Sequence, residues 1–178
     1  MRHLQHSIYL SYVDGLGGWN EPGESIKVLA QAARGEQDTK ILLAHEYGHV
    51  CTFKYGDKAS QMPWWVLEGV AELAAEAFRE GSATSVDGIV RSWAKRDRLA
   101  PWFDMADFRK TDRKWMGNVY TQGHHMLGYI SETFGKQARI DWLKAMAKGK
   151  TIDEASTEVL KMSFDDVDKN WRKSVTEE

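Results

Sequence analysis

The sequence predicts an α+β fold that is predominantly helical, in which a small N-terminal antiparallel sheet with an edge strand precedes a long helix and then a helical lobe. Residues 7–13 are rich in β-branched and aromatic side chains and precede a glycine-rich turn, which is typical of a strand and a turn. From residue 39 onwards, apolar residues recur at helical spacing. Glycine, proline and serine divide this second region into separate helices.

The N-terminal segment is expected to contain a second extended stretch at 25–29, after the turn that begins at Asp14. The first helix is then predicted at 39–55. Asp38 is a suitable N-cap for it, and Gly56 is a suitable residue to end it.

This first helix carries the sequence His45-Glu46-Tyr47-Gly48-His49. On a helix, positions 45 and 49 lie about 40° apart and about 6 Å along the axis, so both imidazoles can reach one metal ion. Glu46 is about 100° from the first histidine and about 60° from the second. It can therefore lean over the metal as a general base for water without binding the ion.

A further glutamate follows the second histidine at a fixed offset, which gives the pattern H-E-x-x-H-x18-E with Glu68 at its end. The five-residue motif alone would arise by chance in about one or two such chains per hundred, and the added glutamate lowers this to roughly one in a thousand. Two histidines and one glutamate form a catalytic zinc set that keeps a position open for water. We therefore expect His45, His49 and Glu68 to bind one Zn²⁺ per chain.

The second helix is predicted at 63–80, from Pro63 in its first turn to Gly81 after its end. Four glutamates recur along it at every fourth position: Glu68, Glu72, Glu76 and Glu80. Glu72 lies one turn after the predicted ligand and can accept a hydrogen bond from a ligating imidazole, which would fix the ring's tautomer. The last two are expected to be solvated.

Further helices are expected along the rest of the chain, with a polar loop at 110–114. Their predicted ranges are 85–98, 104–110, 118–133, 137–147, 152–161 and 164–174, and Thr151 and Ser163 are expected to cap the last two. No repeat or linker is visible. We therefore expect a single catalytic domain over 1–178, with the sheet and motif helix at about 1–56 and the helical lobe at about 57–178.

The chain resembles the gluzincin metallopeptidases, the thermolysin-like clan, through His45, Glu46, His49, Glu68 and the surrounding Trp-x-x-Glu-Gly-x-Ala-Glu segment. It is most similar to the peptidase-MA-like branch, in which a tryptophan-rich turn enters the glutamate helix and a later helix carries Tyr-x-Gln. The resemblance implies a thermolysin-like zincin fold and a zinc peptidase in which Glu46 is the general base. It also implies that the segment around 16–29 forms an edge strand to which substrate adds.

Two further residues acquire candidate roles from the resemblance. Tyr120, in Tyr120-Thr121-Gln122, is the candidate donor to the oxyanion, although a core tyrosine is an equal alternative. His124 lies one turn later and could assist, or it could belong to a half-exposed helix surface with His125.

Zinc aminopeptidases of this clan carry a Gly-x-Met-Glu-Asn motif before the first histidine. Here Gly17-Gly18-Trp19-Asn20-Glu21 has a different order. Glu21 would anchor a substrate amine if the chain were an aminopeptidase, and a simple turn before an edge strand is the alternative.

Composition excludes some classes of function. A net charge of −2 with scattered basic residues gives no footprint for nucleic acid. The resemblance to gluzincins implies that the substrates are peptides or proteins. Cys51 has no second cysteine to pair with and is interpreted as a small buried helix residue rather than a nucleophile.

The sequence gives no indication of the oligomeric state. No signal peptide and no run of eighteen apolar residues is visible, although the chain could be a fragment of an exported or membrane-anchored protein. The alternative function is a metal-binding or regulatory module that keeps the fold without turnover.

Overall fold

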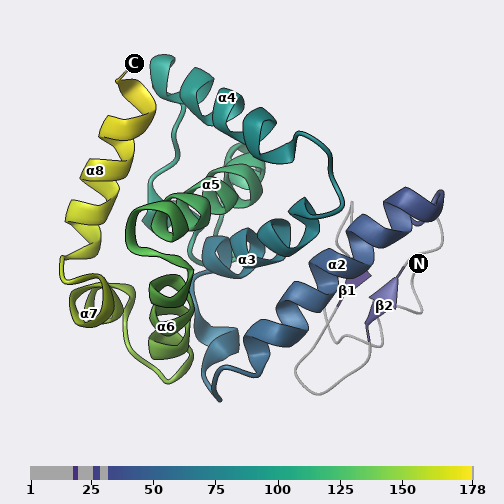
Figure 1. Ribbon diagram of the computed structural model, residues 1–178, viewed down its shortest axis with the longest axis horizontal. Helices are drawn as coiled ribbons and strands as arrows, with labels where there is room; N and C mark the ends of the chain where they lie inside the picture. Colours follow the sequence, from purple (N-terminus) through teal and green to yellow (C-terminus); the bar gives the residue numbers. More distant parts are fainter. Residues whose placement is uncertain (1–17, 20–25, 29–31, 178) are drawn as a thin grey trace.

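The computed structural model describes residues 18–19, 26–28 and 32–177 (Figure 1). Its helices are α2 (Glu36–Phe53), α3 (Trp64–Glu76), α4 (Ser82–Lys95), α5 (Met116–Phe134), α6 (Lys136–Ala147), α7 (Ile152–Ala155) and α8 (Phe164–Thr176). Short helical turns are η1 (Ala59–Gln61), η2 (Trp102–Met105), η3 (Arg113–Trp115) and η4 (Ser156–Leu160), the last of which is a π-helical continuation of α7.

The predicted α+β class is wrong for the described part of the chain, which is a helical fold. There, β-structure is confined to β1 (Gly18–Trp19) and β2 (Lys27–Val28), which pair antiparallel. Two residues per strand are too few to form a layer of the fold, so the predicted N-terminal sheet is not present in the described ranges. The physical reason is that the apolar helix faces bury one another and need no sheet to cover them.

Two parts of the sheet prediction lie outside the described residues. They are the strand at 7–13 and most of the edge segment at 16–29. Within the latter, β1 lies against α2 (Figure 1).

Several helix boundaries differ from those that the sequence predicts. Helix α2 begins at Glu36 with Gly35 as its N-cap, so Asp38 lies in the first turn rather than at the cap. Helix α3 ends at Glu76 instead of residue 80, because the chain leaves the helix through turns that lead to Gly81 in the left-handed region (φ 68°). Helix α4 then begins at Ser82, three residues before its predicted start.

The C-terminal helices agree more closely with the prediction. Helix α6 begins one residue before its predicted start, and α7 with η4 spans all but the last predicted residue. Thr151 and Ser163 accept hydrogen bonds from the third residue of their helices, as N-caps do. The helix predicted at 104–110 is not formed, and its place is taken by a 3₁₀ turn and bends.

The centre of the fold is α3, which packs against α2 on one side and α5 on the other (Figure 1). Helix α4 packs against α5 and α8. An aromatic core joins the C-terminal helices to α3 through rings with centroids 4.3 to 6.5 Å apart: Trp65, Trp102, Trp142, Phe164 and Trp171. The buried indoles find hydrogen-bond acceptors within this core. The N–H of Trp102 donates to Asp168 at 2.7 Å, and that of Trp142 donates to Ser156 at 2.9 Å.

Glycines at the helix crossings allow the three central helices to approach closely. A Cβ on Gly48 would lie 2.9 Å from the Cα of Ala71, where α2 crosses α3. A Cβ on Gly69 would lie 2.7 Å from the carbonyl carbon of Gly123, where α3 crosses α5. Gly48 precedes His49 and Gly69 follows Glu68, so each of these close approaches is adjacent in sequence to a motif residue.

Candidate metal centre

Helices α2 and α3 bring the two motif histidines and Glu68 together in one partly buried cluster. His45 Nε2 lies 3.3 Å from Glu68 Oε2, and His49 Nε2 lies 3.6 Å from the same oxygen. The ligand atoms of all three residues lie within 4.8 Å of one another. Within the described ranges, this is the one group of histidine, cysteine and acidic side chains that could hold a metal ion.

The spacing of these atoms suits a tetrahedral ion. Ligand atoms at about 2.0–2.2 Å from a tetrahedral zinc ion lie roughly 3.3–3.6 Å from one another. The two nitrogen-to-oxygen distances, 3.3 and 3.6 Å, fall in this range. The side chains are only 12–13% exposed, so an ion held between them would be largely shielded from bulk water.

The orientation of His45 is set by Glu72, one turn after Glu68. His45 Nδ1 lies 3.0 Å from Glu72 Oε1, so the hydrogen bond predicted for this glutamate is present. An ionised carboxylate can only accept, so Nδ1 carries a proton that it donates to Glu72, while Nε2 faces Glu68 and is the nitrogen that would bind an ion. Arg79 in turn forms an ion pair with the other oxygen of Glu72. The result is a chain of contacts from Arg79 through Glu72 to the imidazole.

The charges of the cluster favour a bound cation. Burial alone would lower the pKa of His45, but hydrogen bonds and charge from Glu68 and Glu72 raise it to about 9. Burial opposes ionisation of Glu68, yet its two histidine partners lower its pKa to about 2. Burial acts in the same direction on Glu72, whose pKa is lowered to about 2 by His45 and Arg79. The carboxylates thus stay charged and draw a positive charge, a proton or a metal ion, to the ring nitrogens.

Glu46 is only 5% exposed and lies beside the histidines without belonging to the cluster. Burial raises its pKa, and the charges of His49 and His45 act against that rise. Strand β1 passes directly over this carboxylate. A Cβ on Gly18 would lie 2.4 Å from Glu46 Oε1, so a larger residue there would require the carboxylate to move.

Trp64 holds the other oxygen of Glu68. Its indole Nε1 donates to Glu68 Oε1 at 2.8 Å, while Glu68 Oε2 faces the histidines. The backbone N–H of Trp64 donates to Ala106 at 2.8 Å, which fixes the start of α3.

Tyr120 lies at the edge of the same site. Its ring centroid is 6.3 Å from that of His45 and 6.1 Å from that of Trp64. Burial raises the pKa of its hydroxyl, and the carboxylates of Glu68, Glu72 and Glu46 raise it further, so the hydroxyl is a neutral donor. No hydrogen bond to this hydroxyl is formed by any residue in the described ranges.

Gln122, two residues later, is fully buried and clamps the chain at Ala100 with two hydrogen bonds of 2.9 Å. Of the two residues in the Tyr-x-Gln segment, Tyr120 therefore lies at the metal cluster, and Gln122 stabilises the fold.

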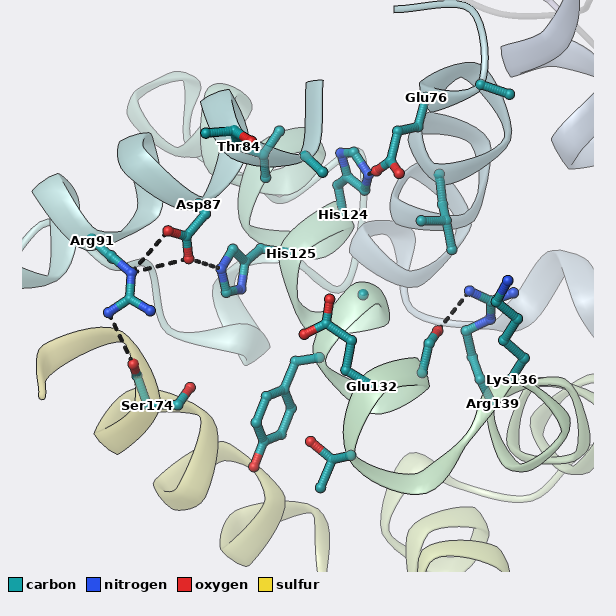
Figure 2. A pocket seen from close by; sticks show the side chains of 18 residues that line it. Glu76, Thr84, Asp87, Arg91, His124, His125, Glu132, Lys136, Arg139 and Ser174 are labelled. Atoms are coloured by element: carbon teal, nitrogen blue, oxygen red, sulfur yellow. Dashed lines mark hydrogen bonds and ion pairs between the residues drawn. The ribbon is translucent and has the colours of Figure 1, made fainter. Parts of the chain in front are cut away.

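His124 is placed away from the metal cluster. Its Nε2 lies 2.6 Å from Glu76 Oε2, and both residues line a pocket of about 920 Å³ between α3, α4, α5, α6 and α8. Figure 2 shows His124 turned toward Glu76 and the adjacent His125 turned toward Asp87. None of the cluster residues lines this pocket. Glu76, predicted to be solvated, is 34% exposed and also pairs with His124, so the prediction holds only in part. Cys51, predicted to be buried, is exposed.

Sequence reasoning missed three residues that shape the site: Trp64, Arg79 and Gly18. Trp64 precedes Glu68 by four positions, so an i,i+4 comparison along the helix would have indicated the contact. Arg79 lies beyond the end of α3 and reaches back, which no helical periodicity predicts. Gly18 meets Glu46 only through the tertiary fold. Glu21, the candidate amine anchor, lies outside the described residues.

Helices in the described ranges are too short or too polar to cross a membrane. No family model matches the chain, and no solved structure matches it. A search of curated proteins finds a Bacillus subtilis (strain 168) protein with the name Uncharacterized protein YhcO, 23% identical over 188 aligned residues. The alignment covers 95% of this chain and 54% of that protein, so the chain spans about half the length of the relative it matches.

Proposed function

We propose that this protein is a zinc-dependent peptidase of the gluzincin type, which hydrolyses peptide bonds with Glu46 as the general base. The observation that carries the proposal is the partly buried cluster of His45, His49 and Glu68, whose nitrogen-to-oxygen distances of 3.3 and 3.6 Å suit a tetrahedral ion. Three protein ligands leave a position for water, which is the arrangement of catalytic rather than structural zinc sites.

The neighbouring residues support hydrolysis rather than metal storage. A zinc ion held by the three side chains would polarise the scissile carbonyl and lower the pKa of a water molecule. Glu46 would take the proton from that water, and its raised pKa lets it keep the proton and later give it to the leaving amine. Tyr120, with its neutral hydroxyl, would donate a hydrogen bond to the oxygen on which negative charge develops.

Metal content and cleavage of a diverse peptide library test the proposal together. We expect about one zinc ion per chain by elemental analysis, and loss of both zinc and cleavage in a His45→Ala, His49→Ala double variant. Glu46→Gln should keep zinc and the thermal unfolding temperature while kcat falls by at least ~10²-fold. Glu80→Gln is the matched control, because Glu80 is exposed beyond the end of α3 and should change neither property.

Each alternative has its own result. A double histidine variant that still holds one zinc per chain would remove the assigned ligands. Zinc binding in the wild type with no cleavage of any library peptide would favour a metal-binding or regulatory module. Near-normal turnover in Glu46→Gln would remove this residue from the reaction. Cleavage only at the N-terminal residue of each peptide would identify an aminopeptidase.

A further inference from the structure

The two oxygens of Glu68 are held by different partners. Oε1 accepts from Trp64 Nε1 at 2.8 Å. Oε2 lies 3.3 Å from His45 Nε2 and 3.6 Å from His49 Nε2. The two oxygens of a carboxylate are close together, so a free carboxylate can bind an ion through both. Here one oxygen, Oε1, already accepts from the indole, and the other, Oε2, is the one that lies near the histidines.

Trp64 is itself held in place on several sides. It is 7% exposed, and its backbone N–H is bonded to Ala106. Its ring packs edge-on against Phe108, with centroids 4.9 Å apart, and against Tyr120 at 6.1 Å. An indole fixed by its packing can hold the carboxylate in one rotation, since the N–H is a donor in a single direction. Both Glu68 and Tyr120 thus take their positions from this ring.

We infer that Trp64 is a positioning residue that restricts Glu68 to binding the metal through one oxygen, and so keeps a coordination position free for water and substrate. The inference rests on the metal site proposed above. A bidentate glutamate would supply a fourth protein ligand atom, and the position that the reaction needs would be taken. Such partners of ligand residues commonly change metal affinity by roughly 10–100-fold when they are removed.

Trp64→Phe removes the N–H and keeps an aromatic ring, so it separates the hydrogen bond from the packing. In the zinc-loaded protein, X-ray absorption at the zinc edge should show one more oxygen neighbour than in the wild type. In the Co²⁺-loaded protein, the visible d–d band should weaken, as it does when coordination number rises. The dissociation constant for zinc should change by roughly 10–100-fold. Trp115→Phe is the matched control, since Trp115 lies outside the cluster beside Lys114.

A second test works on the metal-free protein and does not depend on activity. With ¹⁵N-labelled indoles, the Trp64 N–H should exchange slowly with solvent, and Glu68→Gln should shift its NMR resonance while leaving that of Trp142, which is bonded to Ser156, unchanged. If Trp64→Phe does not fold, the benzothienyl analogue of tryptophan at this position keeps the ring shape and lacks only the N–H.

The outcomes separate this inference from the proposed function. A wild type that binds neither zinc nor Co²⁺ overturns the metal site itself. A wild type that binds both ions, together with a Trp64→Phe or benzothienyl protein of unchanged spectrum and affinity, overturns the role of Trp64 alone. An equal change in Trp115→Phe would also overturn it, because the effect would then be a general consequence of losing an indole.

Discussion

At the scale of single residues, the candidate site pairs two carboxylates of low exposure with positively charged or protonated side chains. Glu68 and Glu72 are carboxylates with low exposure, and buried charges are costly unless they are paired. His45 contacts both carboxylates, and Arg79 forms an ion pair with Glu72. A divalent ion at the ring nitrogens would complete this balance. The residues therefore make a site that favours a cation before any substrate is present.

The sequence predicted the core of this site and missed its surroundings. The i,i+4 histidines and the glutamate at x18 are fixed by helix geometry and by one helix-to-helix contact, so their convergence follows from spacing. The contact of Glu72 with His45 follows from one further turn. The contact of Trp64 with Glu68 has i,i+4 spacing and could have been found from it. The contacts made by Arg79 and Gly18 depend on a chain reversal after α3 and on a neighbouring strand, and spacing carries no information about these two.

Tyr120→Phe tests the candidate donor. The hydroxyl is expected to act only when charge develops on the substrate, so its loss should lower kcat by roughly 10²–10³ and leave KM and zinc content nearly unchanged. Tyr47→Phe is a matched control, because Tyr47 is 62% exposed on α2. Initial rates on a cleaved library peptide give the comparison. An unaltered kcat in Tyr120→Phe would make Tyr120 a packing residue, and a larger loss in His124→Ala would move the role to His124.

At the scale of helices, the site depends on how closely α2 and α3 cross. Gly48 lies within the metal motif, and a Cβ there would overlap the backbone of Ala71 at 2.9 Å. The same residue therefore serves both the packing and the position of the histidines. The sequence motif shows a glycine at this place, but the requirement for it comes from the crossing.

Gly48→Ala should push α2 and α3 apart. We expect it to destabilise the protein by about 1–3 kcal/mol, as overpacking does, and to weaken zinc binding because the histidines move away from Glu68. Gly88→Ala in α4 is the matched control: no atom lies within 4 Å of its Cβ position, so the change should be neutral or stabilising by up to ~1 kcal/mol. Urea unfolding and zinc titration measure both effects. Equal stabilities for the two variants would contradict this account of the crossing.

Helix positions were more predictable than the fold class. The capped C-terminal helices were found to within a few residues because Thr151 and Ser163 are local signals that need no tertiary contact. The N-terminal sheet was predicted from a segment rich in β-branched and aromatic residues. Such residues favour a half-buried position on a packed surface, and their presence does not by itself establish a strand. In the described ranges, helices bury one another instead, and the paired strands β1 and β2 have two residues each.

At the scale of the whole molecule, an aromatic core connects the site to the C-terminus. Trp65 on α3 stacks with Trp102 at 4.3 Å, which in turn lies 5.2 Å from Trp171 on α8. The N–H of Trp171 donates to His125 Nδ1 at 2.8 Å. Helix α3, which carries Glu68, therefore packs through Trp65 against residues more than thirty positions away in the sequence. The sequence shows the tryptophans but not their partners.

Protons and metal ions compete for the same place in this fold. In the metal-free protein, His45 has a pKa of about 9, raised from 6.5 despite burial, because Glu68 and Glu72 accept from its two nitrogens. A group whose folded pKa is raised adds stability below its unfolded pKa and loses it as the pH rises from 6.5 to about 9. The proton on Nε2 is also the one that a metal ion must displace, while the proton on Nδ1 remains with Glu72.

Zinc should therefore stabilise the protein more as the pH rises. At a fixed free zinc concentration, the apparent affinity should increase about tenfold per pH unit from pH 6.5 to 8.5, with about one proton released per ion. The gap in unfolding temperature between zinc-loaded and chelator-treated protein should widen over the same range, by about 1.4 kcal/mol of stabilisation per tenfold gain once zinc exceeds its dissociation constant. Calorimetry in buffers of different ionisation enthalpy counts the proton, and thermal unfolding gives the gap. A gap that stays constant or narrows with pH would show that the ring nitrogen facing Glu68 carries no proton in the metal-free state.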